Sequence, residues 1–202
     1  MTGTRAGYTT ATTESAPTAA VTAGTLTTAT PTITGTARVG QTLTANPGAW
    51  APAPVTLRYQ WLAGGVAISG ATAATYVPAS ADTGKTIKVR VTGSKTGFAS
   101  TYVTSAASAV VQGVLSTAVP TITGTAKVGQ VVTANPGTWG PAPVTFTYQW
   151  YRDGAAITGS TAATRTVHAN DVGKKLTVRV TGAKSGYAST STTSAPTATV
   201  VP

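Results

Sequence analysis

The sequence predicts an all-β protein in which two similar antiparallel β-sandwiches follow one another along the chain. Its composition points to strands, because 45 of the 202 residues are Thr whereas only 6 are Leu and 4 are acidic. Thr favours strands since its branched β-carbon restricts χ1, and Leu and Glu, the usual helix formers, are scarce. The chain also repeats itself, and within each repeat apolar residues alternate with polar ones.

The repeat is long and free of gaps. PTITGTARVGQTLTANPGAWAPAPVTLRYQW, which begins at Pro31, returns as PTITGTAKVGQVVTANPGTWGPAPVTFTYQW, which begins at Pro120. Between residues 31–113 and 120–202, 50 of 83 aligned positions are identical. Two units this similar must share one fold.

A third, truncated copy opens the chain, because residues 2–21 match the last part of each full repeat. We therefore expect a piece of a longer array that begins with the tail of a preceding repeat. The predicted units are a C-terminal strand remnant with a linker at residues 1–28, a first repeat at 29–113 and a second at 114–202.

The strand signals within the first repeat are short and separated by turn residues. A first strand is expected around Ile33 and a second from Gln41 to Ala45, before the turn Asn46-Pro47-Gly48. The later strands are expected at residues 66–69, 75–77, 87–91 and 98–111. With the central strand described next, seven strands in about 85 residues fit a two-sheet Greek key.

The central strand gives the clearest signal and the predicted core. From Val55 to Trp61, every second residue is apolar and the residues between are polar, so one face is expected to be buried. We assign to the core the aromatic residues of this strand and their equivalents in the second repeat, which are Tyr59, Trp61, Tyr148 and Trp150.

The central Trp, followed by Asp82-Thr83-Gly84 and an alternating strand, resembles the strand C tryptophan and the D-x-G corner of immunoglobulin domains. Without Cys, the sandwiches are expected to lack disulfides. The corner residues Asp82 and Gly84, with Asp171 and Gly173 in the second repeat, are interpreted as structural. An Asp two residues before a Gly commonly accepts backbone hydrogen bonds inside its own turn.

A closer resemblance is to the bacterial immunoglobulin-like repeats of actinobacterial secreted and cell-surface proteins. These units read approximately PGxWxPxPVxxxYQWxxxGxxIxGAT and then DxGKxxxVxVTGxxxGY; the first unit here reads PGAWAPAPVTLRYQWLAGGVAISGAT and DTGKTIKVRVTGSKTGF. The second reads PGTWGPAPVTFTYQWYRDGAAITGST and DVGKKLTVRVTGAKSGY. The resemblance implies an immunoglobulin-like fold, an extracellular or cell-surface location, and service as a spacer, adhesive stalk or accessory module.

Catalysis is not expected. The four acids are Glu14, Asp82, Asp153 and Asp171, and the two corner aspartates belong to separate repeats, so no carboxylate pair is predicted for acid-base chemistry. His168 stands alone, without the partners that a zinc site or a catalytic triad requires. No catalytic residue, metal site or cofactor is predicted.

Exposed aromatic rings remain as candidates for binding sugars. Trp50 and Trp139 lie in the Pro-Gly-x-Trp loop before the central strand, and each ring either covers the end of the sandwich or forms a ligand platform. Tyr76 occurs in only one repeat, which suggests that it is exposed.

The net charge of +10 suggests anionic partners, but the cations are dispersed along the chain. We expect weak attraction to anionic or neutral surface polysaccharides and no specific nucleic-acid binding. Membrane insertion is not expected, because no apolar run approaches about 20 residues. The tail at residues 2–28 is expected to pair with a sheet edge, on this chain or another, and to carry any self-association.

Two functions from different classes follow. The first is a structural spacer or adhesive stalk without a binding site. The second is a carbohydrate-binding accessory module of a polysaccharide-degrading enzyme, anchored by Trp50 and Trp139. An immunoglobulin-like decoration on a phage particle is a third alternative that shares the physics of the first. Exposure of the two indole rings discriminates the first two.

Overall fold

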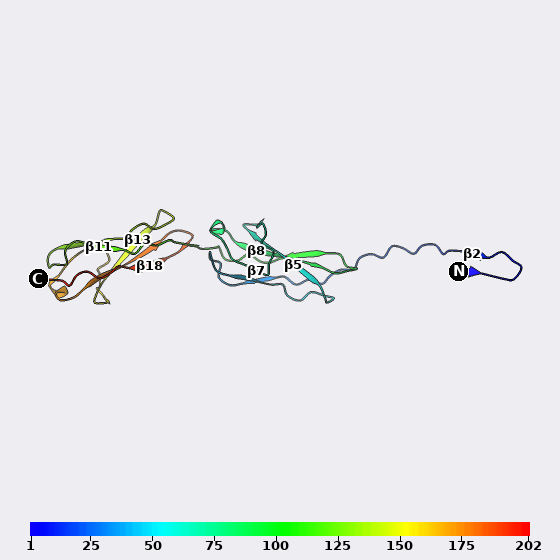
Figure 1. Ribbon diagram of the computed structural model, residues 1–202, viewed down its shortest axis with the longest axis horizontal. Coiled ribbons are helices and arrows are strands. Elements are labelled where there is room, and N and C mark those ends of the chain that lie inside the picture. Colours follow the sequence, from blue (N-terminus) through cyan, green and yellow to red (C-terminus); the bar gives the residue numbers. More distant parts are fainter.

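The computed structural model describes all 202 residues and confirms the predicted all-β fold. Two β-sandwiches lie end to end along the long axis of the molecule, and the N- and C-termini are at its opposite ends (Figure 1). We call residues 24–112 the first sandwich and residues 113–202 the second. The helical elements are two three-residue 3-10 helices, η1 (Ser80–Asp82) and η2 (Ala169–Asp171).

Each sandwich contains one three-stranded and one four-stranded antiparallel sheet. In the first sandwich the orders are β3-β4-β7 and β6-β5-β8-β9. The strands are β3 (Thr32–Thr34), β4 (Leu43–Asn46), β5 (Thr56–Ala63), β6 (Val66–Ala67), β7 (Thr75–Tyr76), β8 (Ile87–Ser94) and β9 (Thr101–Thr104). These seven strands in two sheets form the expected immunoglobulin-like Greek key.

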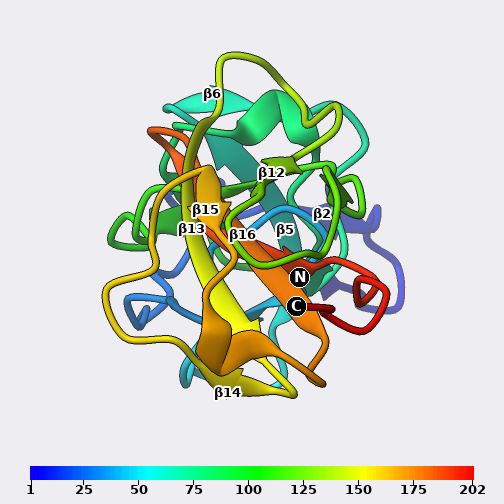
Figure 2. The same cartoon turned by 90° about the vertical axis from the view of Figure 1, so that its left-hand side faces the viewer.

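The second sandwich repeats this order as β11-β12-β15 and β14-β13-β16-β18, and Figure 2 shows it from its end of the molecule. Its strands are β11 (Thr121–Thr123), β12 (Val131–Asn135), β13 (Thr145–Arg152), β14 (Ala155–Ala156), β15 (Thr164–Thr166), β16 (Leu176–Ala183) and β18 (Thr190–Thr193). A short parallel pair is added by β10 (Gly113–Val114) and β17 (Tyr187–Ala188).

The core lies between the two sheets and is centred on the tryptophan of the central strand. Trp61 on β5 pairs with Val89 on β8, and Trp150 on β13 pairs with Val178 on β16. All four side chains are fully buried. Tyr59 and Tyr148 are partly buried and pack against the same clusters.

The last strand of each repeat is shorter than predicted. The sequence predicts one strand over residues 98–111, whereas β9 ends at Thr104. Beyond it, serine hydroxyls replace backbone carbonyls as acceptors: Ser105 Oγ accepts from the Val89 amide at 3.0 Å, and Ser108 Oγ from the Ile87 amide at 2.9 Å. The chain therefore stays beside β8 without a regular ladder.

The N-terminal tail divides into two parts. Residues 1–23 form a small hairpin of β1 (Thr2–Gly3) and β2 (Ala11–Thr12) followed by an extended segment, and all of them are exposed. The expected pairing of this part with a sheet edge does not occur within the chain. By contrast, Leu26 is buried in the first core and Thr27 forms a bridge with Ala51, so residues 24–28 pack onto the first sandwich.

Trp150→Ala is expected to lower the free energy of unfolding of the second sandwich by about 3–5 kcal/mol, because it removes the largest buried side chain of that core. Urea unfolding followed by circular dichroism measures the loss. The matched control is Ser185→Ala on an exposed turn, with a change below about 0.5 kcal/mol. Equal losses at the two sites would contradict the assignment of the core.

Lys95, on the equivalent turn of the first repeat, would not serve as a neutral surface control for the stability measurement, because its side chain makes contacts with another loop. Its Nζ donates hydrogen bonds to the carbonyls of Pro52 at 3.0 Å and Ala53 at 2.9 Å, so the side chain ties the turn to the proline-rich loop.

Candidate functional site

Trp50 and Trp139 cover the ends of their sandwiches and do not form ligand platforms. Their exposed fractions are 8% and 5%, and each indole Nε1 donates to a proline carbonyl of its own loop. Each ring packs closely against a glycine of the four-stranded sheet, since a Cβ atom on Gly93 would come within 2.5 Å of Trp50, and one on Gly182 within 2.6 Å of Trp139. Stacking on sugars needs an exposed ring face, which neither indole offers.

The corner before β8 is organised around the buried carboxylate of Asp82. Its Oδ2 accepts from the Ala79 amide at 2.8 Å and from the Tyr76 hydroxyl at 2.5 Å. The Tyr76 ring stacks on Trp61, with ring centroids 5.6 Å apart, so Tyr76 is half-buried rather than exposed. Gly84 follows with a φ of 81°, in the left-handed region that favours glycine.

Burial and the Asp82 carboxylate together raise the pKa of the Tyr76 hydroxyl to about 12. The hydroxyl therefore remains a hydrogen-bond donor to Asp82 throughout the physiological range. This contact fixes β7 to the corner in the first sandwich.

The equivalent corner of the second sandwich keeps the carboxylate but changes its partners. Asp171 is fully buried, and its Oδ2 accepts from the His168 amide at 2.9 Å. In place of the tyrosine, Arg165 Nη2 donates to both carboxylate oxygens, at 3.0 and 2.8 Å. Arg152 Nε adds a bond of 2.6 Å to Oδ1, so two guanidinium groups meet one carboxylate.

These contacts determine the protonation state of Asp171. Burial alone would raise its pKa, but the hydrogen bond from the His168 amide and the positive charges of Arg152 and Arg165 outweigh burial and hold the pKa below its ordinary value. Asp171 is therefore ionised at neutral pH.

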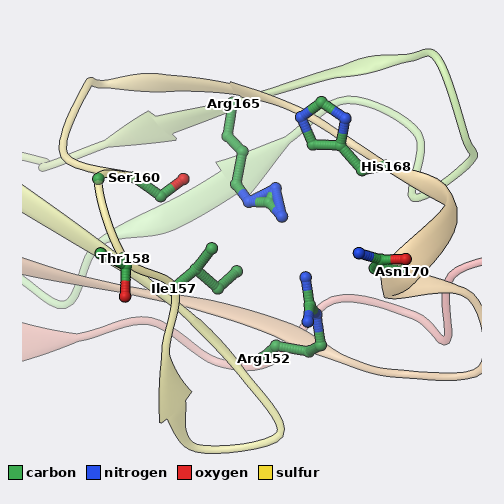
Figure 3. Close-up of a pocket in the computed structure, with 8 residues that line it drawn as sticks. Arg152, Ile157, Thr158, Ser160, Arg165, His168 and Asn170 are labelled. Carbon is green, nitrogen blue, oxygen red and sulfur yellow. The ribbon is translucent and has the colours of Figure 1, made fainter.

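A pocket of about 360 Å³ opens beside this corner, and we call it the arginine pocket. Ile157 is its one hydrophobic lining residue, and the polar side chains around it come from Arg152, Thr158, Ser160, Arg165, His168 and Asn170. Figure 3 shows the guanidinium group of Arg165 extending into the space between Ser160 and His168, with the Arg152 side chain below it.

The sequence-based search did not find this pocket, although a signal was present. Over most of their length the repeats differ at scattered positions, but Tyr76–Ala81 differ from Arg165–Asn170 at six consecutive positions. The pocket residues Arg165, His168 and Asn170 fall within that run. The sequence indicates no role for His168, because it has no second His or Cys nearby, but the structure places it in the lining of the arginine pocket.

The remaining acids do not join a site. Asp153 lies in an exposed turn, where its Oδ1 accepts from the Lys175 amide at 2.9 Å, and this bond lowers its pKa. Glu14 is on the exposed tail. The structure contains no group of three or more His, Cys, Asp and Glu residues placed to hold a metal ion. None of its helices is long and apolar enough to span a membrane.

Comparison with known proteins supports no conclusion about this chain. No family model matches the chain, and no curated protein matches it. Among solved structures, the tandem Ig repeats of Dlar resemble it at 12% sequence identity, covering 87% of this chain and 90% of that one, with a TM-score of 0.23. A likeness this distant carries no argument about the fold or the function of this chain. The strand order itself identifies the two units as immunoglobulin-like sandwiches.

The stability contributed by the ionised Asp171 is expected to depend on pH. Because its folded-state pKa lies below the unfolded value of about 3.9, this contribution is present above about pH 4 and is lost as the pH falls through the folded-state pKa. The stability difference between the natural protein and Asp171→Asn, from urea unfolding, should therefore shrink below about pH 4.

Glu14→Gln provides the control, since Glu14 is exposed on the tail and should leave stability unchanged at every pH. A difference between the natural protein and Asp171→Asn that stays constant from pH 7 to pH 2 would show that the charge of Asp171 does not stabilise the sandwich.

Proposed function

We propose that this chain is a non-catalytic spacer or adhesive stalk segment of a larger extracellular protein. The observation that supports the proposal is the junction between the sandwiches, where consecutive residues belong to different sandwiches. Such a junction limits bending, so successive repeats would extend the molecule in one direction. Figure 1 illustrates the resulting arrangement, with the chain entering and leaving at opposite ends.

Backbone hydrogen bonds hold both sides of the junction. The Gln112 amide donates to the Ala37 carbonyl at 3.0 Å, and the Gln112 carbonyl accepts from the Val39 amide at 2.9 Å, which ties this residue to the first sandwich. The next amide, that of Gly113, donates to the Gly186 carbonyl of the second sandwich at 2.8 Å. The two residues that meet at the junction are thus each held by backbone hydrogen bonds to their own sandwich.

Packing on the second sandwich also requires a glycine at the junction. Gly113 lies against the Tyr187 ring, and a Cβ atom at this position would approach that ring to 2.4 Å. Gly24 has the same relation to Phe98 at the start of the first sandwich, where a Cβ atom would approach the ring to 2.8 Å. The segment at which the chain enters each sandwich thus has the same glycine-on-ring contact, as expected of an array with one fixed geometry.

The finer identity belongs to the same proposal. The Pro-Gly-x-Trp loops, the Tyr-Gln-Trp strands and the Asp-x-Gly-Lys corners support membership of the bacterial immunoglobulin-like repeats found in actinobacterial secreted and cell-surface proteins. An extracellular or cell-surface location would follow from that membership. A surface rich in Thr and poor in charge suits exposure to solvent over a long array.

The two alternatives are affected differently. A carbohydrate-binding module anchored by Trp50 and Trp139 loses its basis, because both rings are buried. A decoration on a phage particle needs the same extended geometry as a stalk, and the proposal covers the role that the two share, which is to hold neighbouring domains apart.

Self-association is a second part of the proposal, and it concerns the tail. Val21 is 97% exposed, whereas its equivalents Val111 and Val200 are buried in the two sandwiches. Exposed apolar residues and unpaired strand edges favour pairing with another sheet edge. We propose that contacts between copies pass through residues 2–23, the part of the predicted 2–28 tail that does not pack on the first sandwich.

Insertion of Gly-Ser-Gly-Ser between Gln112 and Gly113 is expected to broaden the distribution of distances between the sandwiches, because it separates the two sets of hydrogen bonds. The chain contains no Cys, so spin labels on Thr72→Cys and Thr161→Cys report this distance by pulsed electron resonance. An equally broad distribution in the natural chain would overturn the spacer proposal. Unchanged circular dichroism would show that the insertion leaves both sandwiches folded.

Deletion of residues 1–22 is expected to abolish concentration-dependent self-association, measured as mass by light scattering, while the melting of both sandwiches stays unchanged. Leu26 must be kept, because it belongs to the first core. If the full chain and the shortened chain are both monomers, the tail does not mediate contacts between copies.

A further inference from the structure

We propose that the arginine pocket of the second sandwich binds the carboxylate or phosphate group of an acidic sugar. The pocket is formed by residues on β13 and β15, by the loop that precedes β15, and by η2 and the residue before it. Four independent features of the site support this proposal. They are the arginines that replace the partner of the buried Asp, the excess of positive charge, a hydrogen-bond donor without a partner, and the polar lining of the pocket.

The first feature is that the fold does not need arginine at this corner. In the first sandwich, Tyr76 occupies the place of Arg165 and bonds the buried carboxylate through its hydroxyl at 2.5 Å. Ala63 occupies the place of Arg152. The backbone geometry of the two corners is alike, because Ala79 and His168 each donate an amide hydrogen to the carboxylate. The fold of this corner therefore does not require arginine, because a neutral hydroxyl fills the same role in the first sandwich.

The second feature is an excess of positive charge. Arg152 and Arg165 share a single carboxylate, that of Asp171, so the corner carries one uncompensated positive charge. Arg152 uses its Nε for this contact, and its terminal nitrogens are not involved in it. A partly buried cation without a counter-ion attracts an anion more strongly than an exposed one does, since water screens it less.

The third feature is a hydrogen-bond donor with no partner. The Arg165 side chain is 4% exposed, and its Nε makes no hydrogen bond in the structure. Buried donors are nearly always paired, and an unpaired one destabilises the fold unless another group satisfies it. Because this nitrogen has almost no exposed surface, an anionic oxygen in the pocket would satisfy it after a shift of the Arg165 side chain.

The fourth feature is the lining, which favours a sugar as the carrier of the anion. Ser160, Thr158 and Asn170 offer hydroxyl and amide groups, and Ile157 is the only hydrophobic contributor. A volume of about 360 Å³ lies at the lower end of the range for ligand sites, about 300–1,000 Å³, and suits one small ligand. The corresponding hollow in the first sandwich is lined by Tyr76, by the apolar residues Ile68 and Val77 and by small residues, and none of its lining residues is a cation.

The test is a titration of the full chain by two-dimensional amide NMR with sodium glucuronate, glucose 6-phosphate, inorganic phosphate and glucose. Glucuronate or glucose 6-phosphate should shift the signals of His168 and Asn170 with a dissociation constant of about 1 mM or lower. Glucose should cause no shift. Amides of Ala79 and Ala81, at the equivalent positions in the first sandwich, serve as an internal control and should not move.

The decisive variant is Arg152→Ala with Arg165→Tyr, which installs the residue pair of the first sandwich and so uses a combination known to be compatible with this corner. It should weaken binding at least about ten-fold. Asn170→Ala is the second variant, because it leaves all contacts of Asp171 intact and should reduce the affinity for the acidic sugars.

Three results would overturn the proposal. One is the absence of shifts at His168 and Asn170 with both acidic sugars. Another is equal binding by the natural protein and the double variant, which would place the ligand elsewhere. The third is inorganic phosphate binding as tightly as glucose 6-phosphate with no response to glucuronate, which would make the site one for free phosphate.

Discussion

The burial of one indole ring in each sandwich is the interaction on which the rest of the structure depends. Trp150 lies on β13, opposite Val178 on β16, and its Nε1 donates to the Ala162 carbonyl at 2.9 Å. Ala162 precedes β15, which belongs to the other sheet. One side chain thus fills the core and also joins the two layers by a hydrogen bond. The domain has no disulfide between its sheets, so the packing and the hydrogen bond of this ring are a main link between them.

The corners show how the repeats vary without changing their fold. Each corner keeps a buried Asp whose carboxylate accepts a hydrogen bond from the backbone amide of the residue three positions earlier. This contact shapes the turn into β8 in the first sandwich and into β16 in the second. The carboxylate accepts further hydrogen bonds from a neutral phenol in the first repeat and from two guanidinium groups in the second. Because the backbone contact is shared, the second partner is free to change, and the change alters the charge of the surface beside it.

The junction connects this local chemistry to the shape of the whole molecule. Since Gln112 completes one sandwich and Gly113 begins the next, the backbone of each repeat helps to position its neighbour. An array built in this way gains length in proportion to the number of repeats. The proposed site in the arginine pocket, which differs between the repeats, would then be presented at a defined place along such an array.

The sequence by itself determined the period of the repeat, the seven-strand pattern, the buried faces of Trp61 and Trp150, and the structural role of Asp82 and Asp171 in their turns. These follow from local rules, namely alternation along a strand and the preferences of turn residues. Other features depended on contacts between distant segments. Trp50 is buried because Gly93, on β8, leaves room for its ring, and Leu26 packs in a core whose other members come from Leu43 onward. Arg165 turns inward because Asp171 is buried where the guanidinium can reach it, and only the tertiary structure decides whether a charged side chain finds such a partner.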